Sequence, residues 1–450
     1  MNISWYASCF RCSCGVFALA TAGLLAPAAT AQLTPDNTLG SEQSIVNENV
    51  QVRGDFADQI DGGAIRGSNL FHSFSEFNVN EQQRVYFANP AGIETILNRV
   101  TGNDVSDIMG TLGVDGGANL FLLNPNGIIF GENAQLDISG SFTASTADAI
   151  VFPDGGAFSA INPGDTSLLT VGVPLGVQYG PGAQGDITNA GNLAVGAGQE
   201  MTLYGDTVRS SGSLTTSGGL VQALGNRVAL TDSARIDVAS ETGGGTVLVG
   251  GEYRGEGPVP NALRTYVGPD VVINADAVNN GDGGRVIVWA DEATGFYGNI
   301  SARGGSLAGD GGFVEVSGKQ SLAFDGLVDV GAVAGQAGQL LLDPENVIIV
   351  EQAPGVNDGE LNDNEILFGD EPGSEFIISG NAIRDALNNA DVTIEAEDTI
   401  RSDETVVISS GASNSLTLNA SEIILTAPII NLGGGDMGGG AINLESTNGS

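Results

Sequence analysis

The sequence predicts an all-β protein that folds as a right-handed parallel β-helix, and three observations support this class. Apolar residues occur in short runs bounded by Gly, Asn, Asp or Pro, a pattern typical of short strands. Glycine supplies 68 of 450 residues while hydrophobic residues still reach 41%, so the chain combines frequent turns with enough apolar side chains for a core. A strand-and-turn motif also recurs along the chain at solenoid spacing.

The recurring motif has the form Gly-Gly-x-Val-x-Val. It occurs at Gly244–Val249, Gly283–Val288 and Gly311–Val316, with a weaker echo from Gly338, so successive copies begin 39, 28 and 27 residues apart. Stacked coils of this length bury each apolar face against the next coil, and crossovers between parallel strands are right-handed. A string of β-sandwiches is the alternative, but it needs about seven strands in each closed unit of roughly 100 residues. No change in composition marks such units here.

Residues 1–31 are predicted to be a secretory signal peptide. Arg11 precedes an apolar run over 15–26, and Ala29-Thr30-Ala31 fits a cleavage site before Gln32. The run is shorter than the roughly 18 residues of a spanning helix. All three cysteines lie inside this segment, so the mature chain is expected to form no disulfide and to stay linear until it folds.

The charge balance excludes one class of partner. The chain carries a formal net charge of −39. Nucleic-acid-binding proteins meet phosphates with basic patches, so no nucleic-acid partner is expected. The same charge keeps an unfolded chain soluble and opposes early collapse.

The most informative motifs lie between Gln32 and Phe158. An Ile-Leu-Asn-x-Val-x-Gly strand occupies Ile96–Gly102, and Asn124-Pro125-Asn126-Gly127 joins two apolar runs, Leu120–Leu123 and Ile128–Phe130. The tetrapeptide fits a type I turn, because Asn suits the first position, Pro presets φ at the second, and Gly closes the fourth. By itself it indicates one more corner of a solenoid.

Taken in order, these motifs resemble the haemagglutination-activity domain, the N-terminal secretion domain of filamentous-haemagglutinin-like proteins exported by two-partner secretion. The resemblance covers 32–160. It implies that the chain reaches the periplasm of a Gram-negative-type cell, a class that includes cyanobacteria, and crosses the outer membrane through a dedicated β-barrel transporter. The residues that match the family's recognition and folding motif are Asn98, Gly102, Asn124, Pro125, Asn126, Gly127 and Ile128.

The resemblance also implies a secreted or surface-associated exoprotein. Its passenger is expected to be an adhesin for a host-cell or surface glycan or protein. The alternative is a toxin or enzyme whose active module lies beyond residue 450. The expected organisation continues with β-helix repeats over 161–350, an acidic loop over 351–380, and further coils over 381–450 that are expected to be truncated. A short helix is predicted near 382–390, with Ile383, Ala386, Leu387 and Ala390 on one face.

Neither an enzyme nor a cofactor is expected in this segment. His72 is the only histidine, and it lies between phenylalanines in a motif that the resemblance explains. Without mature cysteines, the usual zinc sites are excluded. Carboxylates are abundant, but none forms a pair that spacing singles out. Weak calcium candidates are Asp358, Glu360 and Asp363, because calcium prefers oxygen ligands, although their order is not that of an EF-hand.

Overall fold

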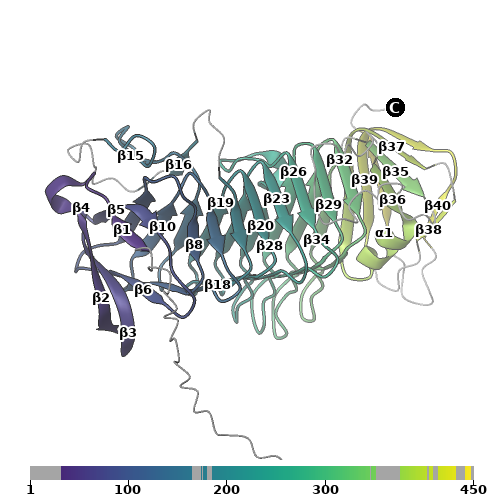
Figure 1. Cartoon of the computed structure of the whole chain (residues 1–450). Helices are drawn as coiled ribbons and strands as arrows, with labels where there is room; N and C mark the ends of the chain where they lie inside the picture. The colour runs from purple at the N-terminus through teal and green to yellow at the C-terminus, as the bar shows by residue number, and fades with distance from the viewer. Residues whose placement is uncertain are drawn as a thin grey trace, which may run out of the picture.

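The protein is a parallel β-helix, as predicted, in a computed structural model. The structure describes residues 32–164, 174, 176–179, 185–344, 346–350, 376–402, 405–408, 414–431 and 441–446. The predicted signal peptide and most of the predicted acidic loop, with its three calcium candidates, lie outside the described residues. Figure 1 shows the described strands stacked side by side along one long axis.

Three parallel sheets form the solenoid, and we name them sheets A, B and C. Among the described residues, sheets B and C end at Asp329 and Phe324, whereas sheet A continues to Ser446. The strands of sheet A are β5 (Asn69–Phe77), β7 (Thr95–Val100), β10 (Asn119–Leu123), β13 (Phe142–Ser145), β19 (Glu200–Tyr204), β22 (Leu220–Leu224), β25 (Thr246–Val249), β28 (Arg285–Ala290), β31 (Phe313–Gly318), β34 (Gln339–Leu342), β37 (Asp391–Ser402), β39 (Leu416–Leu425) and β41 (Ile442–Ser446). β35 (Asn346–Val350) and β36 (Phe376–Ser379) also join this sheet through β37.

Sheet B contains β3 (Asp55–Gly62), β6 (Arg84–Ala88), β9 (Thr111–Asp115), β12 (Gln135–Asp137), β18 (Asn192–Ala194), β21 (Ser213–Thr215), β24 (Arg235–Asp237), β27 (Val272–Asn274), β30 (Asn299–Ser301) and β33 (Leu327–Asp329). Sheet C contains β8 (Ser106–Ile108), β11 (Ile128–Phe130), β17 (Ile187–Asn189), β20 (Thr207–Ser210), β23 (Arg227–Leu230), β26 (Arg264–Val267), β29 (Ala293–Phe296) and β32 (Ser321–Phe324). From β7 to β33, each coil runs through sheets A, C and B in that order.

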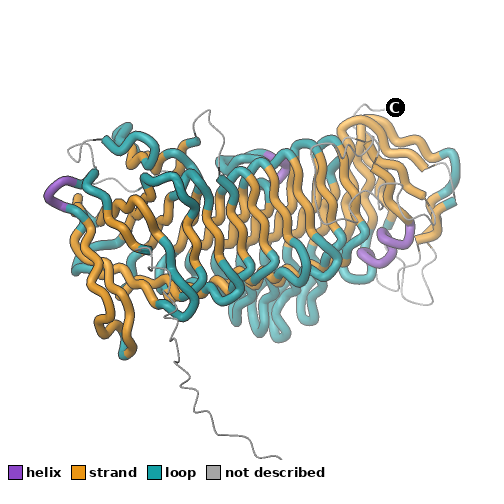
Figure 2. The backbone as a smooth tube through the Cα atoms, in the orientation of Figure 1, coloured by secondary structure: helices purple, strands orange, loops and turns teal. Residues whose placement is uncertain are grey.

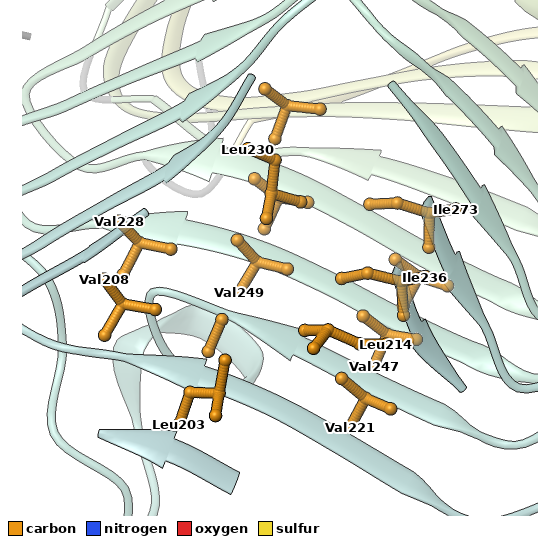
Figure 3. Packing of buried hydrophobic residues seen from close by; sticks show 14 of the residues in the cluster. Leu203, Val208, Leu214, Val221, Val228, Leu230, Ile236, Val247, Val249 and Ile273 are labelled. Carbon is orange, nitrogen blue, oxygen red and sulfur yellow. The ribbon is translucent and has the colours of Figure 1, made fainter. Parts of the chain in front are cut away.

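Inward-facing side chains of like size stack from coil to coil and fill the interior. In sheet A, Val221, Val247 and Val286 are aligned in register, and in sheet B the same holds for Leu214, Ile236 and Ile273. All of these side chains are buried, and Figure 3 shows how several of them meet between the sheets. The alternation of apolar and polar residues therefore places one continuous core inside the coils.

The predicted Gly-Gly-x-Val-x-Val repeat marks the corner that leads into sheet A. Its copies lead into β25, β28 and β31, and the echo at Gly338 leads into β34, so the copies lie on successive coils whose strands pair in register. The glycines are required because the backbones of neighbouring coils approach closely there. A Cβ atom on Gly312 would lie 2.1 Å from the carbonyl oxygen of Gly284.

Replacing Gly312 by alanine should therefore lower the free energy of unfolding by about 1–3 kcal/mol, the usual cost of overpacking. Gly117→Ala is the control, because a Cβ atom at Gly117 would meet nothing within 4 Å. Thermal melting of the two variants measures the difference. Equal melting temperatures would contradict the close-approach explanation.

A row of projecting loops, which we call the fin, connects sheet B to sheet A over the central coils (Figures 1 and 2). It consists of 239–244, 276–283, 303–311 and 331–337. Each loop is closed at its base by a backbone hydrogen bond, such as that from Gly312 N–H to Ala302 O at 2.8 Å. Adjacent loops also bond to each other, as in the bond from Gly305 N–H to Gly281 O at 3.0 Å. The fin is thus an ordered continuation of the stack.

Several elements depart from a plain solenoid. The hairpin of β2 (Ser44–Val52) and β3 projects from the N-terminal end (Figure 1), and β1 (Leu33–Pro35) and β4 (Ala64–Arg66) pair antiparallel with β5. A small antiparallel sheet of β15 (Ala157–Ser159), β14 (Ala149–Val151) and β16 (Gly176–Gln178) lies outside the coils. The remaining elements are η1 (Gly40–Glu42), η3 (Tyr253–Gly255) and the paired strands β38 (Val406–Ile408) and β40 (Ile429–Asn431).

The predicted helix is present as α1 (Gly380–Leu387). Ile383, Ala386 and Leu387 are buried, as is Ala390 just after the helix, so the predicted apolar face packs on the solenoid. Among the residues that the structure describes, no helix is both long and apolar enough to cross a membrane.

Candidate functional site at the Asn-Pro-Asn-Gly corner

The Asn124–Gly127 turn carries the chain from β10 in sheet A to β11 in sheet C. The Gly127 N–H donates to the Asn124 carbonyl at 3.2 Å, which closes a four-residue β-turn. Asn126 does not have a positive φ, so a type II turn is excluded and the predicted type I turn fits. Gly127 has a φ of +131°, which strains any other L-residue at this position.

The side chain of Asn124 is fully buried and links two successive corners. Its amide nitrogen donates to the Asp104 carbonyl and to Ser106 Oγ, both at 3.0 Å. Its amide oxygen accepts from the backbone N–H and the side-chain amide of Asn126, also at 3.0 Å each. Both polar atoms are therefore satisfied, as a buried amide requires.

Asn126 extends the network to Gly102. Its amide nitrogen donates to the Gly102 carbonyl at 2.8 Å. Gly102 itself must lack a side chain, because a Cβ atom there would lie 2.0 Å from the Ser75 carbonyl oxygen of the preceding coil. The structure thus joins Gly102, Asn124 and Asn126 into one ladder of hydrogen bonds across the corner.

The next coil, which begins near Gly185, forms backbone hydrogen bonds with the same turn. Gly185 N–H donates to the Pro125 carbonyl at 2.9 Å, and Ile128 N–H donates to the Asp186 carbonyl at 3.0 Å. Gly185 packs so closely that a Cβ atom would lie 2.4 Å from Gly127 N. The corner therefore sets the register of three coils, and Ile128 points from it into the core.

Asn98 lies apart from the corner. It pairs in register with His72 on β5, and both side chains are fully buried in the solenoid interior. Neither polar atom of the Asn98 amide has a hydrogen-bond partner among the described residues. The structure thus brings six of the seven predicted site residues to one place and puts the seventh inside the coils.

A second polar network at this end is not indicated by the sequence patterns. Arg99 is buried, and two hydroxyl groups connect its guanidinium to the carboxylate of Asp36. Ser73 Oγ accepts from Arg99 Nε at 2.9 Å and donates to Asp36 at 2.7 Å. Thr38 Oγ1 accepts from Arg99 Nη2 at 2.9 Å and likewise donates to Asp36, at 2.6 Å.

The network stabilises both charges. Burial opposes ionisation of Asp36, but hydrogen bonds from Thr101, Thr38 and Ser73 outweigh it, so the pKa of this carboxyl lies below its ordinary value. Burial lowers the pKa of Arg99 to about 10, which leaves the guanidinium charged at neutral pH. Arg99 is the only charged residue in the apolar strand Ile96–Val100, and that isolation is the signal that could have identified it.

Arg99 also fastens the small outer sheet to the coils. Its Nη1 donates to the Ser159 carbonyl at 2.7 Å, and its guanidinium lies 4.3 Å from the centre of the Phe158 ring. A second apolar cluster lies between this sheet and sheet A, and it includes Phe71, Leu97, Leu123, Ile150 and Phe158. The N-terminal coils are therefore covered on their outer face.

His72 makes the stability of these coils depend on pH. Burial lowers the pKa of His72 to about 3, from 6.5 in an unfolded chain, and its Nδ1 lies 3.0 Å from Ser44 Oγ. The native state thus binds fewer protons than the unfolded state below pH 6.5. The stability that depends on a neutral His72 is fully present above pH 6.5 and is lost progressively as the pH falls from 6.5 toward 3. At about 1.4 kcal/mol per pH unit, the loss at pH 5 should reach about 2 kcal/mol.

Hydrogen exchange of the β5 and β7 amides at pH 7.5 and pH 5, corrected for intrinsic rates, measures this effect. A local probe is needed because burial raises the pKa of Glu315 to about 7, and its charging opposes folding as pH rises. His72→Gln should flatten the pH dependence in β5 and β7. A wild-type slope that His72→Gln leaves unchanged would show that other groups cause it.

Comparisons with known proteins agree with this architecture. The family model described as the TPS secretion domain matches residues 31–255, half of the chain. The heme/hemopexin-binding protein of Haemophilus influenzae is 36% identical over 72 residues, which span 16% of this chain and 8% of that protein. The crystal structure of the HMW1 secretion domain from Haemophilus influenzae aligns with a TM-score of 0.51 at 17% identity, covering 90% of this chain and all of that domain.

The family model identifies the N-terminal half of this parallel β-helix as a secretion domain. The chain belongs to the TPS secretion domain family and is an exported protein of a Gram-negative two-partner secretion system. Proteins of this family engage a transporter in the outer membrane. The matched residues extend past 160, the end expected for the secretion domain, and the coils on both sides of that position share one core.

Proposed function

We propose that the coils beyond the secretion domain form an adhesive, non-catalytic passenger, which is displayed or released after the chain crosses a dedicated β-barrel transporter. The continuous stack of coils supports the export part of this proposal, because a solenoid that buries each coil only against its neighbours can fold progressively as it emerges. His72, the only histidine in the sequence, is fully buried and offers no accessible imidazole for catalysis.

The fin is the surface that we propose for adhesion. It presents Val278, Leu307 and Val333 on three adjacent loops, and these side chains are 47%, 70% and 84% exposed. Exposed apolar side chains gathered on an ordered projection are typical of contact surfaces. A host-cell or surface glycan or protein is the expected target class.

Export is tested in a Gram-negative host that expresses the chain with and without a two-partner secretion transporter from the organism that encodes the chain. We expect the chain in the medium or on the cell surface only when the transporter is present. Equal export without the transporter would contradict the proposed dedicated partner, and retention in the periplasm in both strains would do so as well.

Adhesion is tested with the exported chain carrying Val278→Ser, Leu307→Ser and Val333→Ser together. Attachment to host cells or to a surface should fall at least tenfold relative to the wild type. Leu327→Ser is the control, because Leu327 is 58% exposed on sheet B, outside the fin. Equal attachment of the triple variant would refute the role of the fin.

The full-length reading frame of the gene separates an adhesin from the alternative. A repetitive continuation supports an adhesive passenger, whereas a compact terminal module rich in His, Lys or Cys would favour a toxin or enzyme.

A further inference from the structure

One loop of the solenoid, residues 250–262, extends over the coils that follow it in the chain. We call this loop the strap. It leaves the coil between β25 and β26, and the bond from Ala262 N–H to Gly250 O at 2.6 Å closes its base. Its tip contains η3, where Arg254 adopts a left-handed φ of +55°. The tip lies on the outer face of sheet A.

The strap covers a ladder of side chains that is aliphatic except at one position. Leu248, Ile287, Glu315 and Leu341 are in register on β25, β28, β31 and β34. Glu315 is fully buried, although burying a carboxylate is costly unless it is paired or hydrogen-bonded. Packing alone would favour a fourth aliphatic residue here.

A hydrogen bond from the strap accounts for the buried carboxylate of Glu315. The backbone N–H of Arg254 lies 3.0 and 3.2 Å from the two carboxylate oxygens of Glu315. Burial raises the pKa of this carboxyl to about 7, and the bond from Arg254 opposes that rise. Glu315 is therefore removed from solvent, and the hydrogen bond that it accepts from the Arg254 N–H at the tip of the strap partly offsets the cost of that burial.

Further contacts fix the strap on the same face. The Tyr253 and Phe313 rings meet edge to face at 5.7 Å, and Glu252 pairs with Arg285 at 2.5 Å. Trp289 is 4% exposed, and its ring lies so close to Gly255 that a Cβ atom there would be 2.6 Å away. Burial of Trp289 therefore depends on the strap.

The strap reaches across several coils that follow it in the chain. The Arg254 guanidinium pairs with Glu395 on β37 at 2.5 Å, 141 residues later. Four inter-strand steps separate β25 from β37 in sheet A, which corresponds to about 19 Å. In any order of folding from the N-terminus, the strap can close fully only after β37 has been added.

We propose that the strap is a late-closing lock, which Glu315 anchors through the Arg254 N–H and which Glu395 completes, so that the coils from β25 to β37 are clasped together only once all of them have formed. Opening of the strap is then a local event, separate from unfolding of the coils beneath it.

The anchor is tested in the full chain carrying Trp5→Phe, so that Trp289 is the only tryptophan. Glu315→Leu completes the aliphatic ladder but removes the acceptor, whereas Glu315→Gln keeps a carbonyl oxygen. Glu200→Leu is the control, because Glu200 is an exposed glutamate on β19 of the same sheet, away from the strap.

In Glu315→Leu, Trp289 emission should shift to the red, and amide exchange over 252–257 should accelerate at least tenfold, while β28 and β31 remain protected. Glu315→Gln and Glu200→Leu should behave like the background chain. Unchanged emission and exchange in Glu315→Leu would overturn the proposal. Loss of protection in β28 and β31 would also overturn it, because the strap would then be part of the core.

Late closure is tested by refolding the same full chain from denaturant with two probes. The far-UV circular dichroism of the strands should recover first, and the blue shift of Trp289 should follow in a slower phase that Glu395→Ala slows at least threefold. Recovery of both signals at one rate, or a Trp289 phase that Glu395→Ala does not affect, would overturn the late closure.

Discussion

Replacing Asn124 by isoleucine should destabilise the first coils by about 2–4 kcal/mol and abolish export. The substitution removes four hydrogen bonds and leaves the buried Ser106 hydroxyl without its amide partner. Each buried polar group that is left unsatisfied costs about 1–3 kcal/mol. Hydrogen exchange of the β10 and β11 amides measures stability, and the amount of chain in the medium measures export.

A matched variant separates the fold of the corner from recognition by the transporter. Asn189→Ile removes another fully buried amide, which lies on a later coil than Asn124. This amide donates to Ser210 Oγ at 3.0 Å and accepts from the Gly191 N–H at 3.0 Å. If the corner is itself recognised, Asn124→Ile loses export while Asn189→Ile, at a similar loss of stability, retains it. Equal export of the two variants would show that the Asn124–Gly127 motif acts only in folding and is not itself recognised by the transporter. Full stability of Asn124→Ile would show that the hydrogen bonds of Asn124 do not stabilise the corner.

Replacing Arg99 by methionine should cost about 2–4 kcal/mol, because it leaves the Ser159 carbonyl and the Ser73 and Thr38 hydroxyls without the donor that they accept from. Methionine fills the volume but leaves Asp36 facing two hydroxyls without the cation that orients them. The Ser159 carbonyl also loses its donor, so the small outer sheet should detach. Hydrogen exchange over 149–160 and over β7 measures both effects.

Arg66→Met is the control for this experiment. Arg66 pairs with Glu42 at 2.8 Å, but both side chains are partly exposed, and such pairs contribute about 0–1 kcal/mol. A similar small loss in Arg99→Met would show that the connecting hydroxyls, and not the guanidinium, hold this end of the solenoid together.

The sequence indicated the features whose causes are local. The glycine pairs at 244, 283 and 311 mark corners because the backbone there tolerates no Cβ atom, and the alternation after them sends every second side chain inward. The Asn124–Gly127 turn was predictable for the same reason, since its residue types suit the dihedral angles of one turn. The apolar face of α1 follows directly from helical periodicity.

Patterns of this kind did not reveal which residues far apart in the chain would meet. Arg99 and Asp36 are 63 residues apart, and the hydroxyls of Thr38, which is close to Asp36 in the chain, and of Ser73 on β5 connect them. Asn98 belongs to the motif by sequence, yet the alternation of the strand turns it into the interior, away from the corner. Residues 250–262 look like an ordinary loop because nothing in their composition indicates where the tip will rest.

The sequence by itself therefore determined the coil: its strands, its corners and the side chains that face inward. Only the tertiary structure decided what covers the outer face of each coil, because a period of two residues assigns a side chain to a face but does not say what packs on it. Glu315 occupies an outward position that its strand pattern would leave to solvent, and it is buried because a loop from an earlier coil folds over it.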